Sequence, residues 1–129
     1  MLLPTTLCMA AAAAIINIWL SMRIGALRHK TGIEVGDGGN ELLTRRMRAQ
    51  LNFIENTPIT LILCALVEIA GKGGAWLAPL MAVFLVGRLA HGIGMDGRFR
   101  AGRPIGFLTA LMADLALAAV AVLSALGKI

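Results

Sequence analysis

The chain has 129 residues, of which 58% are apolar and 15% are charged. This hydrophobicity excludes an intrinsically disordered chain, and the length excludes two full-sized domains. The 12 Lys and Arg against 7 Asp and Glu give a net charge of +5. Nucleic-acid binding is nevertheless not expected, because the four Phe and two Trp do not alternate with the basic residues to form stacking platforms. So much apolar surface favours a protein that lies in a lipid bilayer.

The first apolar segment contains no charged side chain over its 22 residues, which is enough for one helix that spans a bilayer. We predict a helix over about residues 2–22. The first basic residue, Arg23, follows the apolar run and does not precede it. A cleaved signal peptide needs a positive region at its start, so the pattern favours a retained helix.

A second helix is predicted over about residues 41–70, after the turn-rich run 36–40. Asn40 is a favourable N-cap, and Glu41 just inside it suits the positive end of the helix dipole. This helix therefore begins well before the membrane, and Pro58 is expected to kink it.

Two further helices are predicted over about residues 75–93 and 105–126, separated by glycine-rich turns. Arg88 and His91 interrupt the third apolar segment and Asp114 interrupts the fourth. Such residues usually face the protein interior. The predicted fold is an all-α, integral membrane four-helix bundle that forms a single domain over residues 1–129.

The orientation in the membrane follows from the Lys and Arg residues. The first and third loops together contain nine of them, whereas the second loop and the C-terminus contain only Lys72 and Lys128. The positive-inside rule therefore predicts that loops one and three are cytoplasmic and that both termini lie on the opposite side. In a bacterium, this multi-pass protein would lie in the inner membrane.

Neither cysteine indicates a metal site or a disulfide. Cys8 and Cys64 lie in apolar segments without a nearby His or second Cys, so both are predicted to be buried, free thiols, and no metal is expected. The run from Gly92 to Gly97 spells G-x-G-x-x-G. A dinucleotide site needs a preceding strand, which a membrane helix does not provide, so we interpret this match as chance.

A polar stripe runs along the second predicted helix. Its members are three or four residues apart and fall within roughly 80° of the helix surface: Arg45, Arg48, Asn52 and Glu55. Glu55 lies inside the apolar segment, where an unpaired carboxylate is costly. Arg88 lies at a matching depth on the third helix, so we predict a Glu55–Arg88 ion pair. This pair either fixes helix packing alone or also shapes a ligand site.

Other polar residues allow alternatives. His91 lies one turn beyond Arg88 and is either a hydrogen-bonded structural residue or a ligand contact. Arg98, Arg100 and Arg103 either set topology and bind lipid headgroups or, with Arg45 and Arg48, form a site for a small anion with several carboxylates. Asp114 has no obvious partner, and protonation, another subunit or a hydroxyl would each satisfy it.

The second predicted helix contains the run Arg45-Arg46-Met47-Arg48-Ala49-Gln50-Leu51-Asn52-Phe53-Ile54-Glu55-Asn56-Thr57-Pro58. This run resembles the signature of the MAPEG family, the membrane-associated proteins in eicosanoid and glutathione metabolism. Residues 87–94 and 103–106 are similar to the end of the family's third helix and the following loop. The resemblance implies a homotrimer in the lipid bilayer. It also implies that glutathione, as cosubstrate, binds between subunits near the cytoplasmic face.

The resemblance further implies roles for individual residues. Arg48, Asn52 and Glu55 would hold the tripeptide, Arg45 would reach a carboxylate, and Arg103 or Arg100 would face the thiol. Arg88, His91 and Arg98 complete the predicted site. The implied function is a glutathione transferase or peroxidase in which arginine stabilises the thiolate for attack on lipophilic electrophiles or lipid hydroperoxides. The alternatives are a non-catalytic member of the family that binds lipid or a partner, and a small transporter or structural membrane protein.

Overall fold

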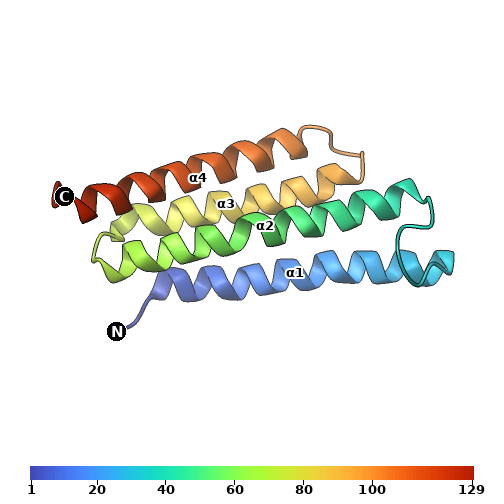
Figure 1. Ribbon diagram of the computed structural model, residues 1–129, viewed down its shortest axis with the longest axis horizontal. Helices are drawn as coiled ribbons and strands as arrows, with labels where there is room; N and C mark the ends of the chain where they lie inside the picture. Colours follow the sequence, from blue (N-terminus) through green and yellow to red (C-terminus); the bar gives the residue numbers. More distant parts are fainter.

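The computed structural model describes residues 1–129 as four antiparallel helices (Figure 1). The helices are α1 (Pro4–Thr31), α2 (Glu41–Ile69), α3 (Gly74–Met95) and α4 (Gly102–Ala125). Each helix is long and apolar enough to cross a membrane. The predicted all-α bundle with four spans is therefore confirmed.

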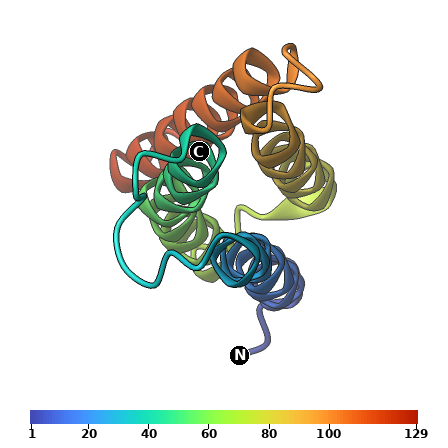
Figure 2. The same cartoon turned by 90° about the vertical axis from the view of Figure 1, so that its right-hand side faces the viewer.

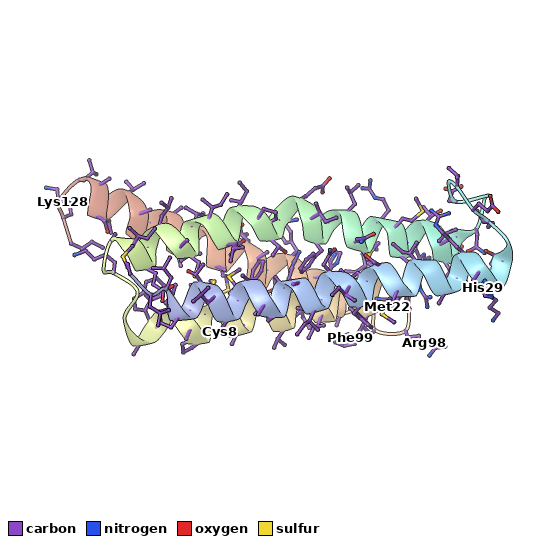
Figure 3. All side chains as sticks on the ribbon, turned by 90° about the horizontal axis from the view of Figure 1, so that it is seen from below. Cys8, Met22, His29, Arg98, Phe99 and Lys128 are labelled. Atoms are coloured by element: carbon purple, nitrogen blue, oxygen red, sulfur yellow. The ribbon has the colours of Figure 1, made fainter.

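The two ends of the bundle differ. Both termini and the short α2–α3 turn lie at one end, and the two longer loops lie at the other (Figure 1). At the loop end, α1 and α2 project beyond α3 and α4, so His29 lies well past Arg98 (Figures 1 and 3). Helix α1 ends at Thr31, beyond the predicted end near residue 22. Basic residues in its last turn suit the negative end of the helix dipole, which favours this extension.

Helix α2 begins where its capping residues predict. The side-chain oxygen of Asn40 accepts a hydrogen bond from the backbone N–H of Leu43 at 2.9 Å, and Glu41 lies in the first turn. The helix continues through Pro58 to Ile69 without interruption.

Helices α3 and α4 pack closely because small residues line their contact. On α4 the buried small residues follow a spacing of four, four and three residues: Gly102, Gly106, Ala110 and Ala113. A Cβ atom at Gly106 would lie only 2.8 Å from the carbonyl oxygen of Gly87 on α3, so the helices approach backbone to backbone. Such stripes bring membrane helices together through van der Waals contact. Helix α4 packs on α2 and α3, whereas α1 lies apart from it on the other side (Figure 2).

The core contains two apolar clusters. The larger cluster joins α1–α4 through residues such as Met81, Phe84 and Leu117, and the smaller one joins α1 and α2 around Leu20 and Phe53. Many large apolar side chains remain exposed on the chain. This arrangement is typical of helices that face lipid.

Glu68 at the end of α2 caps the start of α1. Its carboxylate accepts hydrogen bonds from the backbone N–H groups of Thr5 and Thr6 at 3.0 and 2.9 Å and from the Thr6 hydroxyl at 2.8 Å. Free N–H groups at a helix start favour such an anion. Near this contact Cys64 is buried, as predicted, but Cys8 is exposed on the surface of α1, so its predicted burial is wrong.

Candidate functional site

A polar cavity of about 470 Å³, here called the first pocket, opens between α2, α3 and α4 near the loop end. It is lined by Asn52, Asn56, Arg88, His91, Arg100, Arg103, Pro104, Phe107 and Ala110. Three of these side chains are guanidinium groups, and none is a carboxylate. A pocket with this lining favours an anionic ligand.

Arg88 lies against the wall of the first pocket and is 3% exposed. Its guanidinium donates to the side-chain oxygen of Asn52 at 2.8 Å and to the backbone carbonyl of Gly106, and it lies 5.6 Å from the ring centroid of Phe84. Its Nε atom is buried without a hydrogen-bond partner. Because both hydrogen-bond partners of this buried cation are neutral, Arg88 adds to the attraction of the pocket for an anion.

The predicted Glu55–Arg88 ion pair is wrong within a single chain. Glu55 is exposed and forms no ion pair, whereas Asn52 is the α2 residue that contacts Arg88. The reason is the helix rotation of about 100° per residue. Around the axis of α2, Asn56 is rotated roughly 40° from Asn52 towards the pocket. Glu55 is rotated roughly 60° from Asn52 in the opposite direction, away from the pocket. Sequence reasoning missed Asn56, although its spacing of four residues from Asn52 pointed to it.

A second pocket of about 300 Å³ lies beside the first at the loop end. It is lined by Arg45, Gly94, Met95, Gly97, Arg100 and Arg103. Arg100 and Arg103 therefore line both pockets, whereas Arg45 lines only the second. The guanidinium of Arg45 also contacts the carboxylate of Glu41 at 2.5 Å.

The remaining predicted site residues lie elsewhere. Arg48 lines a groove of about 350 Å³ with Ile24 and Arg28 between α1 and α2. Arg98 is exposed on the loop between α3 and α4 and lines neither pocket (Figure 3). The structure thus brings five predicted residues together in the first pocket, namely Asn52, Arg88, His91, Arg100 and Arg103. It separates Arg48, Glu55 and Arg98 from them.

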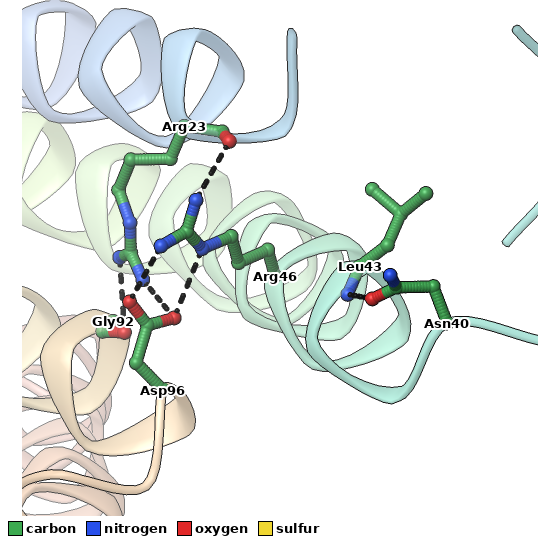
Figure 4. A network of polar contacts seen from close by, with 6 residues as sticks. All are labelled: Arg23, Asn40, Leu43, Arg46, Gly92 and Asp96. Atoms are coloured by element: carbon green, nitrogen blue, oxygen red, sulfur yellow. Dashed lines mark hydrogen bonds and ion pairs between the residues drawn. The ribbon is translucent and has the colours of Figure 1, made fainter. Parts of the chain in front are cut away.

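Asp96 joins three helices at the start of the arginine-rich loop (Figure 4). Its carboxylate accepts from the Arg46 guanidinium at 3.1 and 3.2 Å and also pairs with Arg23. Arg46 donates to the Arg23 carbonyl at 3.0 Å, and Arg23 donates to the Gly92 carbonyl at 3.0 Å. This network was not predicted, since no sequence spacing relates residues so far apart. It fixes the first residue of the loop that positions Arg100 and Arg103.

Asp114 lies one turn beyond Ala110, below the first pocket, and accepts a hydrogen bond from the Thr60 hydroxyl at 2.6 Å. Of the three alternatives for this carboxyl, the hydroxyl partner is therefore present. The G-x-G-x-x-G run lies at the end of α3 and in the following turn, with no strand before it. The segment before the run is therefore a helix, as predicted.

Comparison with known proteins gives one finding. The sequence profile described as the MAPEG family matches residues 6–123, which is almost the whole chain. No curated protein matches the chain.

Proposed function

The chain belongs to the MAPEG family, and we propose that it is a membrane glutathione transferase or peroxidase for lipophilic substrates. The family includes such enzymes as well as non-catalytic members. The observation that supports catalysis is the lining of the first pocket, which combines three guanidinium groups with two Asn side chains and no carboxylate. A non-catalytic protein that binds only the apolar part of a lipid has no need for three guanidinium groups around a polar pocket.

Glutathione matches this lining in charge, since it has two carboxylates, one amine and one thiol. The guanidinium groups of Arg88, Arg100 and Arg103 would bind its anionic groups, and Asn52, Asn56 and His91 offer hydrogen-bonding partners. A free thiol has a pKa of about 8.5, so little thiolate exists at neutral pH. Arg103 or Arg100 would lower that pKa by stabilising the anion.

The thiolate would then perform one of two reactions. It attacks an electrophilic carbon to form a carbon–sulfur bond and displaces the leaving group with its electron pair. Alternatively, it attacks the terminal oxygen of a lipid hydroperoxide, breaks the oxygen–oxygen bond and releases the lipid alcohol after protonation. A second glutathione then reduces the resulting sulfenic acid and yields glutathione disulfide and water. In neither reaction is a protein cysteine the nucleophile.

We further propose that the pocket is completed by a neighbouring copy in a homotrimer. Glu55 and Arg48 project from α2 away from the first pocket of their own chain, and Glu55 has no ion-pair partner. A lone carboxylate on the outside of a membrane helix is costly. In a trimer, the Glu55 side chain of one copy would bind the glutathione amine in the pocket of the next, with Arg48 beside it.

Substrate access and orientation complete the proposal. Phe107 lines the first pocket and is 63% exposed, so a lipophilic substrate can reach the pocket from the bilayer. We propose that the loop end is cytoplasmic, as the positive-inside rule predicts. Labelling of a cysteine introduced at Gly38, after both native cysteines have been replaced, tests this orientation. Labelling from the outside alone would overturn it.

The central experiment is a thiolate difference spectrum of the purified protein with glutathione. We expect saturable binding with thiolate absorbance at neutral pH, and loss of that absorbance in Arg103→Ala or Arg100→Ala. Lys72→Ala, a charge change at the opposite end of the bundle, is the matched control and should keep the wild-type signal. Absence of both binding and thiolate would refute the proposal. Binding without thiolate would support the non-catalytic alternative.

A further inference from the structure

The second pocket contains positive charge that glutathione binding in the first pocket does not need. Arg45 lines the second pocket but not the first. Arg100 and Arg103 form a wall that the two pockets share. Its six lining residues include three arginines and no acidic residue. The pocket is therefore a second place where an anion would be stabilised.

Nearby carboxylates do not neutralise this charge. Asp96 lies between the lining residues Met95 and Gly97, but its carboxylate is paired with Arg23 and Arg46 (Figure 4). Glu41 contacts Arg45, yet its side chain is 78% exposed, so water and salt weaken that pair. Three arginines thus face the pocket against one solvated carboxylate.

The backbone of the pocket is shaped by two glycines. Gly97 has φ +86°, and a Cβ atom there would lie 3.0 Å from the Arg45 guanidinium. A Cβ atom at Gly94 would lie 2.8 Å from the backbone nitrogen of Arg103 and 2.9 Å from the carbonyl oxygen of Phe99. Glycine at both positions therefore lets Arg45 and the start of α4 approach the end of α3 closely. The arginines converge on one small cavity for this reason.

The depth of the pocket indicates the source of its ligand. Helix α3 has 22 residues, which at about 1.5 Å per residue is close to the ~30 Å thickness of the hydrocarbon layer. Gly94 and Met95 at its end therefore lie near the hydrocarbon edge, and the second pocket lies in the headgroup layer. Helices α1 and α2 project beyond this level (Figure 1).

We propose that the second pocket binds a phosphate group, and that the phosphate is the headgroup phosphate of an anionic phospholipid. Arginine forks donate paired hydrogen bonds to phosphate oxygens, and basic pockets between membrane helices bind anionic headgroups. The volume of about 300 Å³ lies at the lower end for small-molecule pockets, which suits a headgroup. This lipid site adjoins the proposed glutathione site and shares the wall formed by Arg100 and Arg103, but lipid binding does not depend on catalysis.

Native mass spectrometry of the protein in neutral detergent, without glutathione, tests the proposal. Phosphatidylglycerol is titrated against phosphatidylcholine of the same acyl chains, and glycerol phosphate and inorganic phosphate are added as soluble competitors. We expect phosphatidylglycerol to bind at least tenfold more tightly than phosphatidylcholine. Arg45→Ala should weaken phosphatidylglycerol binding about tenfold, since it removes one charge-assisted pair. Lys30→Ala, which removes an exposed charge at the same end but lines none of the pockets described above, should change binding less than twofold.

The outcomes separate the alternatives. Equal binding of the two lipids would overturn the anionic phospholipid as the ligand, since both contain a phosphate and only phosphatidylglycerol has a net negative charge. Equal effects of Arg45→Ala and Lys30→Ala would overturn the second pocket as the site. Displacement of lipid by glycerol phosphate at a similar concentration would support the phosphate site but overturn the lipid as its source. If Arg45→Ala fails to fold, Arg45→Lys provides the test, because it keeps the charge, loses the fork and should give an intermediate affinity.

Discussion

A methyl group added at Gly106 is expected to push α3 and α4 apart and to distort the first pocket. In Gly106→Ala the new Cβ atom would lie 2.4 Å from the Cβ atom of His91 and 2.8 Å from the Gly87 carbonyl oxygen, both on α3, against 3.4 Å or more for an ordinary contact. The helices must therefore separate by about 1.0 Å (3.4 − 2.4), because neither a backbone oxygen nor a Cβ atom can rotate away as the end of a side chain can. The same atom would lie 3.3 Å from the guanidinium of Arg88, which donates to the Gly106 carbonyl.

The magnitude follows from a matched comparison with Gly25→Ala. Gly25 lies within α1, and a Cβ atom there would have no neighbour within 4 Å. Both substitutions gain the same helix propensity, up to about 1 kcal/mol. Only Gly106→Ala adds the overpacking cost, about 1–3 kcal/mol. The free energy of unfolding of Gly106→Ala should therefore be about 1–3 kcal/mol lower than that of Gly25→Ala.

Reversible unfolding in mixed micelles with increasing denaturing detergent measures this difference. Glutathione binding to the same samples should be about tenfold weaker in Gly106→Ala, because Arg88 shifts with α4, and unchanged in Gly25→Ala. Equal unfolding free energies for the two variants would refute the close backbone approach of α3 and α4. A stability loss without any change in glutathione affinity would instead show that the pocket does not depend on this contact.

Two further predictions concern the polar contacts at the loop end. Asp96→Asn should cost about 2 kcal/mol of stability, because it removes charge-assisted bonds to two partly buried arginines. The same substitution should also speed tryptic cleavage after Arg98. The control Glu34→Gln, at an exposed carboxylate without an ion pair, should change neither the free energy of unfolding nor the rate of cleavage. Asn40→Ala should lower the free energy of unfolding by about 1 kcal/mol in the same assay. Asn40→Asp should leave it unchanged, because its side chain can still accept the hydrogen bond from the Leu43 N–H. Equal losses of stability in both variants would contradict the role of Asn40 as the helix cap.

Part of the candidate site could be predicted from the sequence because its residues lie in two segments that both resemble the same family. Asn52, Arg100 and Arg103 were expected near one another and do line the first pocket. The stripe on α2 was correct in spacing, but a stripe roughly 80° wide is too broad to face one neighbour. As a result Asn52 faces Arg88, whereas Glu55 faces outwards.

The bundle class, the four apolar spans and the cap at Asn40 can be derived from the amino-acid sequence, because they depend on hydrophobic length and on contacts within a few residues. Which polar groups contact one another depends on how the four helices pack. Arg88 pairs with Asn52 because helix rotation and the glycine contacts set how α2, α3 and α4 face one another. Asp96 binds Arg23 and Arg46, more than 45 residues away, because the bundle brings three helix ends together. Pairing between distant helices depends on packing, which no local pattern specifies.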